Sequence, residues 1–193
     1  MDRLDQLIAR IDQLNSQDPN TELVGQAQRP RELAAAQRLS EWVMRLDPGA
    51  SEALRIAARG QHVQRWTIPR GQYPMTRAGY LKWRETLKAF HIETVAALMR
   101  EVGYSDAMVA RVAAMMSKRQ LAEDRDTQTL EDALCLVFLE TQLADLAQKI
   151  AEDKLQDVLR KTWAKMSPQG RQAALQLPMS PPLKAIVVRA VAS

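Results

Sequence analysis

The stretch TRAGYLKWRETLKAFHIETVAALMREVG, residues 76–103, predicts one long helix. Threonine often caps helix N-termini, so Thr76 marks the start of this helix. Glycine commonly follows the last turn of a helix, so Gly103 marks its end. We therefore predict a helix from Thr76 to about Val102, the longest that we expect in the chain.

Similar start and stop signals lie on both sides of this stretch. Apolar residues at helical spacing predict a first helix over residues 1–15. Further helices are expected over residues 30–46, 52–66, 105–119, 129–148 and 152–165, and two short ones beginning with Ser167-Pro168 and Ser180-Pro181. Residues 16–30, 67–75 and 120–128 are predicted to be loops, and no stretch alternates convincingly as a strand would. The sequence thus predicts an all-α fold.

The length and composition favour one globular domain. The chain has 193 residues, of which 46% are hydrophobic and 26% are charged, as in ordinary globular proteins. We expect a single domain over residues 1–193. Within it we expect an N-terminal helix over 1–15, a helical core over 31–148 and a C-terminal helical extension over 152–193.

The sequence also bears on the compartment. No apolar run approaches the roughly 18 residues that span a bilayer, and the charged N-terminus is unlike a signal peptide. Cys135 is the single cysteine and lies in an apolar run, so we expect a buried, inert thiol and no internal disulfide. We predict a cytoplasmic protein that does not bind membranes.

Positive charge is concentrated in one segment. Eight cationic residues lie between Ala53 and Phe90 and only Glu85 opposes them, a local balance of +7 against +4 for the whole chain. The remainder of the protein is therefore net acidic. A cationic segment in acidic surroundings predicts a local anion site rather than a general coat for nucleic acid.

Aromatic residues alternate with the cations of this segment. Arginine binds phosphate oxygens in pairs, and aromatic faces stack on bases. The predicted substrate-binding residues are Arg59, Gln61, Arg65, Arg70, Arg77, Tyr80, Arg84 and Lys118. Helical spacing places Arg77, Tyr80 and Arg84 on one face. The alternative is that these arginines solvate a helix face and pair with acidic neighbours, while the aromatic residues pack.

The chain has two histidines, His62 and His91, each in a predicted helix. A His-Glu-x-x-His pair is absent, which excludes the zinc-protease helix. Neither histidine has a glutamate three residues before it, which excludes the Glu-x-x-His pattern of di-iron bundles. A glycine-rich phosphate loop and a nucleophile elbow are also absent.

Four segments resemble the HD-domain hydrolases, helical bundles whose metal ligands come from successive helices in the order H…HD…D. They cover about Arg31 to Glu140. The segments are Glu32-Leu-Ala-Ala-Ala-Gln-Arg-Leu, Ala57-Ala-Arg-Gly-Gln-His62-Val, His91-Ile-Glu-Thr-Val-Ala-Ala-Leu-Met with Gly103-Tyr104, and Leu130-Glu-Asp-Ala-Leu134. The chain departs from the family at Glu32, where the first histidine is usual, and at Gln61-His62, where His-Asp is usual.

This resemblance implies an HD-like helical bundle with added N- and C-terminal helices. It also implies a centre in which Glu32, His62, His91 and Asp132 bind one divalent ion, namely Mn²⁺, Fe²⁺, Zn²⁺ or Mg²⁺. Such an ion activates water for attack on a phosphate ester. Glu131 and Glu93 are the expected catalytic base or partners of the ligands.

The chain is also similar to an uncharacterised family of about this length, a domain of unknown function. The strings that carry this similarity are long. They are Arg59-Gly-Gln-His-Val-Gln-Arg-Trp-Thr-Ile-Pro-Arg70, Tyr73-Pro-Met-Thr-Arg-Ala-Gly-Tyr-Leu-Lys-Trp-Arg84, Leu130-Glu-Asp-Ala-Leu-Cys-Leu-Val-Phe-Leu-Glu140 and Lys161-Thr-Trp-Ala-Lys-Met-Ser167.

These observations leave three functions open. The first is a metal-dependent phosphohydrolase that acts on a nucleotide or related phosphate ester. The second is a non-catalytic module that binds a nucleotide or RNA, and the third is a helical protein-interaction domain. The expected partner is a phosphorylated small molecule or nucleotide. A nucleic-acid ligand and a homodimer stay open.

Overall fold

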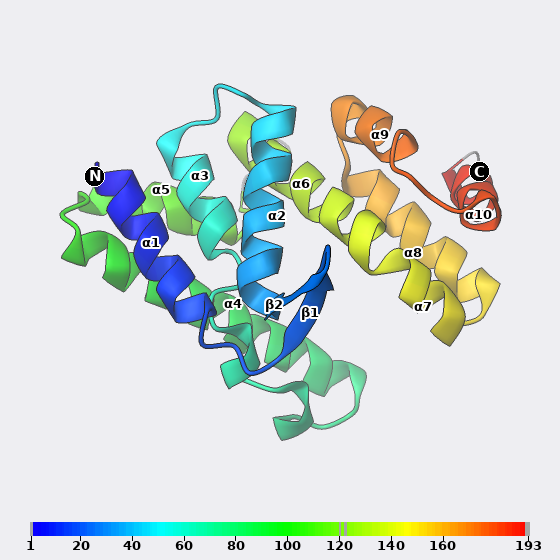
Figure 1. Cartoon of the computed structure of the whole chain (residues 1–193), viewed down its shortest axis with the longest axis horizontal. Helices are drawn as coiled ribbons and strands as arrows, with labels where there is room; N and C mark the ends of the chain where they lie inside the picture. Colours follow the sequence, from blue (N-terminus) through cyan, green and yellow to red (C-terminus); the bar gives the residue numbers. More distant parts are fainter. Residues whose placement is uncertain (1, 120, 122, 192–193) are drawn as a thin grey trace.

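A computed structural model describes residues 2–119, 121 and 123–191 of the chain (Figure 1). Helices dominate this part of the protein, and the prediction of an all-α bundle is confirmed. The helices are α1 (Arg3–Asn15), α2 (Arg31–Leu46), α3 (Glu52–Gly60), α4 (Arg77–Glu101), α5 (Asp106–Met116), α6 (Arg125–Thr141), α7 (Leu143–Lys149), α8 (Glu152–Lys165), α9 (Pro168–Leu175) and α10 (Pro181–Val191).

Helix α4 is the long helix that residues 76–103 predict. The Thr76 hydroxyl accepts a hydrogen bond from the Gly79 amide at 3.1 Å, which caps the first turn. Gly103, with a φ of +84°, follows the last turn in a conformation that favours glycine. Both ends were therefore predictable from local residues.

One hydrophobic core connects the N-terminal helices to the C-terminal ones. It includes Leu7 and Ile11 of α1, Leu54 of α3, Leu136 of α6 and Leu155 of α8, each at most 1% exposed. Figure 1 shows α6 running between α1–α5 on one side and α7–α10 on the other. The first helix thus packs on the bundle through its apolar face.

The prediction that residues 16–30 form a loop without strands is wrong. They contain an antiparallel hairpin of β1 (Thr21–Val24) and β2 (Ala27–Pro30), in which Thr21 pairs with Pro30 and Val24 with Ala27. Gly25 turns the hairpin with a φ of +62°. Each strand has only four residues, too few for a clear alternation in the sequence.

The prediction that one helix covers residues 52–66 is also wrong, because α3 ends at Gly60. A Cβ atom at Gly60 would overlap Cγ2 of Val95 on α4, so α3 and α4 approach closely there. The chain then turns, and Gln64 takes a left-handed conformation with a φ of +52°. Two short 3-10 helices follow, η1 (Arg65–Thr67) and η2 (Arg70–Gln72).

The predicted helix over residues 129–148 is interrupted. Helix α6 ends at Thr141 and α7 begins at Leu143, because Gln142 has a φ of −120° and leaves helical geometry. At the C-terminal end, the two predicted Ser-Pro helix starts are confirmed, as α9 and α10 begin at Pro168 and Pro181. Within the described residues, no helix has both the length and the apolar character that crossing a membrane requires.

Candidate functional site

The turn after α3 brings His62 next to His91 of α4. The two ring centroids lie 5.9 Å apart, with an angle of 68° between the ring planes. The Nδ1 atom of His91 lies 2.8 Å from the carbonyl oxygen of Val63. Because a carbonyl oxygen accepts, Nδ1 carries the proton and Nε2 of His91 is left with a free lone pair. The structure therefore unites two histidines that are 29 positions apart in sequence.

Local backbone geometry holds this turn in place. Val63 is fully buried, which anchors the carbonyl group that orients His91. The amide of Gln64 donates to Oδ1 of the buried Asn15 on α1 at 3.0 Å, and this bond supports the left-handed conformation of Gln64. The site thus depends on contacts from α1, α3 and α4.

Burial keeps both imidazoles neutral. It lowers the pKa of His62 well below its usual range, and the charges of Arg65, Lys118 and Arg84 lower it further. Burial also lowers the pKa of His91 to about 4. The hydrogen bond to Val63 raises this pKa, whereas the charge of Arg65 lowers it. At neutral pH both side chains are therefore uncharged.

Glu32, at the first turn of α2, is the acidic member of this site. Burial raises the pKa of its carboxyl group to about 7, although the charge of Arg65 opposes the shift. The buried carboxylate of Asp18 accepts from the Glu32 amide at 3.0 Å and holds this end of α2. Arg65 therefore acts electrostatically on Glu32, His62 and His91 together.

Arg65 is placed by the 3-10 segment that follows the turn. Its amide donates to the carbonyl oxygen of His62 at 3.1 Å. Its guanidinium carbon lies 5.4 Å from the ring centroid of Trp83, in the range of a cation–π contact. The indole nitrogen of Trp83 in turn donates to the carbonyl oxygen of Ile68 at 2.9 Å, which fixes the ring.

Lys118 completes this group from the end of α5. Its φ of +58° is a left-handed conformation that is uncommon for a side chain other than glycine. Its ammonium group forms an ion pair with Glu131, which is 3% exposed, and Lys165 lies 3.8 Å from the same carboxylate. We call Glu32, His62, Arg65, His91 and Lys118 the Arg65 cluster.

Glu131 was expected to act as a catalytic base, and its surroundings favour another role. Its carboxylate pairs with both Lys118 and Lys165 and thereby orients the two lysines. Cys135, one turn further along α6, is 6% exposed, and burial and the charge of Glu131 raise its pKa to about 12. This agrees with the buried, inert thiol that the sequence predicts.

Asp132 is used in a structural contact. Its carboxylate accepts from the Ser167 amide at 2.8 Å, from the Ser167 hydroxyl, and from Nε2 of Gln128 at 3.0 Å. Gly170 packs so closely on this carboxylate that an added Cβ atom would overlap it. Asp132 therefore fixes the start of α9.

The predicted four-ligand metal centre is not formed as expected. Among the residues that the structure describes, no three or more histidine, cysteine, aspartate or glutamate side chains are grouped so that they could hold a metal ion. The structure unites His62 and His91, whereas the oxygens of Asp132 are taken by Ser167 and Gln128. The chain as folded does not fit the ligand set that the HD resemblance implies.

The other predicted site residues are dispersed. Arg59 forms an ion pair with Asp12 at 2.7 Å and so joins α3 to α1. Gln61 is buried next to His62, and its Oε1 atom has no hydrogen-bond partner within the described part of the chain. Glu93 and Arg77 lie exposed on α4.

Arg70, Tyr80 and Arg84 lie together outside the cluster. Arg70 donates to the carbonyl oxygens of Tyr73 and Pro74 at 2.9 and 2.7 Å. Arg84 lies 3.4 Å from the hydroxyl group of Tyr80. These three side chains therefore form a group at the N-terminal end of α4.

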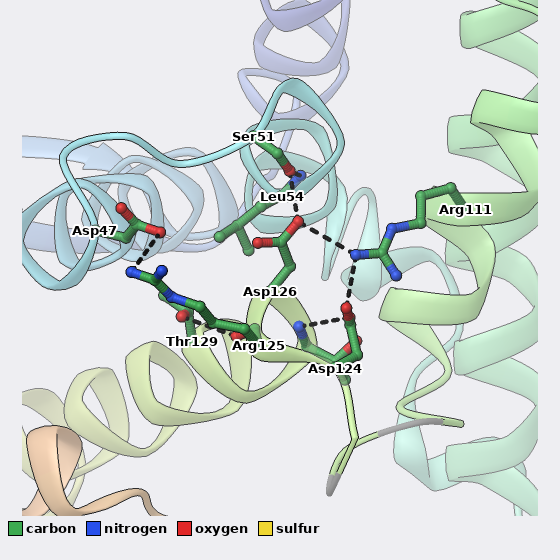
Figure 2. Close-up of polar contacts among 9 residues, drawn as sticks. Asp47, Ser51, Leu54, Arg111, Asp124, Arg125, Asp126 and Thr129 are labelled. Atoms are coloured by element: carbon green, nitrogen blue, oxygen red, sulfur yellow. Dashed lines mark hydrogen bonds and ion pairs between the residues drawn. The ribbon is translucent and has the colours of Figure 1, made fainter.

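A polar network that sequence reasoning missed holds the start of α6 (Figure 2). Arg111 of α5 contacts Asp124 at 2.7 Å and Asp126 at 3.3 Å, and the Ser51 hydroxyl donates to Asp126 at 2.7 Å. The network ties α3, α5 and α6 together and thereby fixes the helix that carries Glu131. Asp124 as a helix cap was the one signal in the sequence that could have found it.

Sequence reasoning also missed the bond between His91 and Val63. This bond has no sequence signal, because its acceptor is a backbone carbonyl group. The contact of Lys165 with Glu131 depends on how α8 folds back on α6.

Comparison with known proteins gives one match. The profile of a protein family described as a domain of unknown function (DUF4202) matches residues 5–187. No curated protein and no solved structure matches the chain significantly. The matched range includes the whole Arg65 cluster.

Proposed function

This chain belongs to the DUF4202 family, a domain of unknown function, and from that premise we propose that its Arg65 cluster binds a phosphate ester of the nucleotide class. The family membership that the sequence predicts is thereby confirmed, whereas the likeness to HD hydrolases stays a prediction. The function has to be argued from the site itself, because the family brings no activity with it.

One observation carries the proposal. Three cations from three separate segments, Arg65, Lys118 and Arg84, all act on the partly buried imidazole of His62. Such a concentration of positive charge around a neutral group attracts an anion. A phosphate group offers several oxygens, which suit the paired donors of arginine and the point charge of lysine.

The two neutral imidazoles suit the same ligand. The N–H group of His91 is used by Val63, so its Nε2 atom can accept a hydrogen bond from a hydroxyl group of the ester. Neutral His62 carries one N–H group that can donate to a phosphate oxygen. Burial is the main reason why His62 is deprotonated, and a bound phosphate dianion would offset the positive charges that add to this effect. Arg65 lies on the ring of Trp83, so an aromatic face is adjacent to the phosphate position and favours a ligand with a base.

Calorimetric titration tests this proposal. We expect the purified protein to bind nucleoside phosphates, with an affinity that falls as salt rises. Arg65→Gln should weaken binding by roughly tenfold or more, since it removes a charged donor from a half-buried site. The matched control is Arg160→Gln, an exposed arginine on α8 that pairs with Asp157, and it should bind like the unaltered protein. Absence of nucleotide binding, or an equal affinity in Arg65→Gln, would overturn the proposal.

The second candidate is hydrolysis of the bound ester. It is favoured by Glu32, because a carboxyl group with a pKa of about 7 exchanges protons with water near neutral pH. We assign Glu32 the role of general base in this candidate, with Arg65 and Lys118 stabilising charge on the phosphate. The predicted divalent metal enters no step, because Asp132 is committed to α9 and the cluster lacks the expected ligand set.

Phosphate release separates the two candidates. A hydrolase releases inorganic phosphate from the bound nucleotide, and Glu32→Gln abolishes the release without abolishing binding. A binding module shows no release in either form. The assay is run with a chelator and then with added Mn²⁺, Zn²⁺ or Mg²⁺. Phosphate release that requires metal and disappears in His62→Ala would support a metal-dependent phosphohydrolase in which the two imidazoles are ligands.

A further inference from the structure

A series of cation and ring contacts leads from the Arg65 cluster to the surface. Arg65 lies over Trp83 at 5.4 Å, and the ring of Trp83 lies 5.9 Å from that of Tyr80. Arg84 and Arg70 then approach the Tyr80 ring at 5.9 and 6.0 Å. We call Arg65, Trp83, Tyr80, Arg84 and Arg70 the cation–aromatic strip.

Exposure increases from Arg65 to Tyr80 and Arg84, whereas Arg70 is half-buried. Arg65 and Trp83 are half-buried, whereas the side chain of Tyr80 is 42% exposed. Arg84 lies on the exposed side of α4, one turn after Tyr80. A ligand that begins at the Arg65 cluster therefore meets further cations and a further aromatic face as it leaves the protein.

Hydrogen bonds to backbone carbonyl groups position Trp83 and Arg70 of the strip before any ligand arrives. The Trp83 indole donates to Ile68, and Arg70 donates to the carbonyl oxygens of Tyr73 and Pro74. Gly79 lies so close to Pro74 that a Cβ atom there would overlap the Pro74 oxygen, which fixes the loop against α4. Little ordering is needed on binding, so these contacts contribute to affinity.

The charge around the strip matches a polyanion. Arg77, Lys82 and Lys88 lie on the same helix as Tyr80, and the acidic Glu85 pairs with Lys82 at 3.6 Å. A single nucleotide would occupy the Arg65 cluster and leave Tyr80 and Arg70 unused. Several phosphates joined in a chain, with a base between them, would use all of them.

We infer that the ligand is the end of a single-stranded nucleic acid. This rests on the proposed function, because the terminal phosphate is the group that the Arg65 cluster binds. The neighbouring base stacks on Tyr80, and the following phosphates lie against Arg84 and Arg70. A single strand is specified because the faces of its bases are available for stacking on aromatic side chains, whereas those of a duplex are covered by neighbouring pairs.

The inference is tested by comparing ligand lengths. Binding is measured for a phosphorylated mononucleotide, the corresponding dinucleotide and a longer oligonucleotide, as DNA and as RNA. We expect affinity to rise with length, by roughly tenfold or more from mononucleotide to oligonucleotide. The salt dependence should also steepen, because each added phosphate contact releases counterions.

Variants of Tyr80 distinguish stacking from charge. Tyr80→Ala should remove most of the gain with length and leave mononucleotide binding unchanged, whereas Tyr80→Phe should keep the gain. The matched control is Leu81→Ala, an exposed apolar residue on the same turn, which should behave like the unaltered protein. Arg65→Gln should weaken the binding of every length.

Each other result has a defined meaning. Equal affinity for mononucleotide and oligonucleotide, or an unchanged gain in Tyr80→Ala, overturns the inference and leaves the proposed nucleotide site intact. Competition by polyglutamate as strong as that by an oligonucleotide of equal charge overturns it too, because the surface then recognises charge alone. If neither mononucleotide nor oligonucleotide binds, the proposed function itself fails.

Discussion

The Nδ1 atom of His91 donates a hydrogen bond to the carbonyl oxygen of Val63 at 2.8 Å, and this bond determines which nitrogen of the ring faces the site. The donor comes from the long helix α4 and the acceptor from the turn after α3. Because the acceptor is a buried backbone group, protonation of His91 at Nε2 is the only change of charge that this arrangement permits.

The first prediction concerns the pH dependence of stability. The pKa of His91 is lowered from 6.5 to about 4, so the unfolded chain binds its proton first as the pH falls. The stability that the neutral imidazole contributes is complete above pH 6.5 and is lost as the pH falls toward 4. In His91→Gln this loss should be smaller by roughly 2 to 3 kcal/mol, as measured by urea unfolding over this range.

An independent readout guards against a variant that merely misfolds. Nitrogen NMR of the unaltered protein should show Nδ1 of His91 protonated and Nε2 unprotonated at neutral pH. The opposite tautomer would contradict the hydrogen bond to Val63, and a charged ring at pH 6.5 would contradict the lowered pKa of His91.

The second prediction concerns Glu32, whose contribution to stability falls as the pH rises, whereas that of His91 falls as the pH decreases. Burial raises the pKa of Glu32 to about 7, so the folded protein keeps a proton that the unfolded chain has already released. Its stabilising contribution is complete below pH 4.5 and is lost as the pH rises through about 7. Glu32→Gln removes this loss, so above pH 7 it should be more stable than the unaltered protein by roughly 1 to 3 kcal/mol. Equal stability of the two proteins in alkaline buffer would show that Glu32 titrates normally.

The third prediction distinguishes a helix cap from a metal ligand at Asp132. Its carboxylate accepts three hydrogen bonds, two of them from Ser167. Asp132→Ala should lower the free energy of unfolding by about 1 to 3 kcal/mol, because it leaves the half-buried donors of Ser167 and Gln128 without this acceptor. Ser167→Ala should lower it too, and the double variant should lose less than the sum, since both substitutions remove the same contact. Full additivity would exclude this shared role, and so would a metal content that depends on Asp132 alone.

Asp132 also illustrates what the sequence could not supply. The HD resemblance at Leu130–Leu134 implied that Asp132 is a metal ligand, and the structure shows Asp132 only 3% exposed. Its partner Ser167 lies 35 positions away, and Ser167-Pro168 predicts a helix start without indicating what else the serine contacts. The choice between a cap and a ligand depends on how α9 folds back on α6, which no local pattern specifies.

The histidine pair shows what the sequence could supply. The predicted helix around His62 was too long, yet the expectation that His62 and His91 lie close together is met. Charge alternation with aromatic residues singled out Arg65, which lies over the ring of Trp83, and its role in binding stays a prediction. Helix end signals correctly bounded α4. Short elements, such as the hairpin at residues 21–30, escaped because four residues carry too little pattern to be separated from a loop.

The fourth prediction tests the contact that positions the site. Gly60 allows the last turn of α3 to lie against Val95 of α4, because a Cβ atom there would overlap Cγ2 of Val95. Gly60→Ala should therefore separate the two helices, lower the free energy of unfolding by about 1 to 3 kcal/mol, and weaken nucleotide binding by displacing His62 from His91. The additional substitution Val95→Ala makes room for the methyl group and should restore part of both losses. The control is Gly71→Ala, where an added Cβ atom meets open space and stability should change little. If Gly60→Ala binds and unfolds like the unaltered protein, the close approach of α3 and α4 is not what holds the two histidines together.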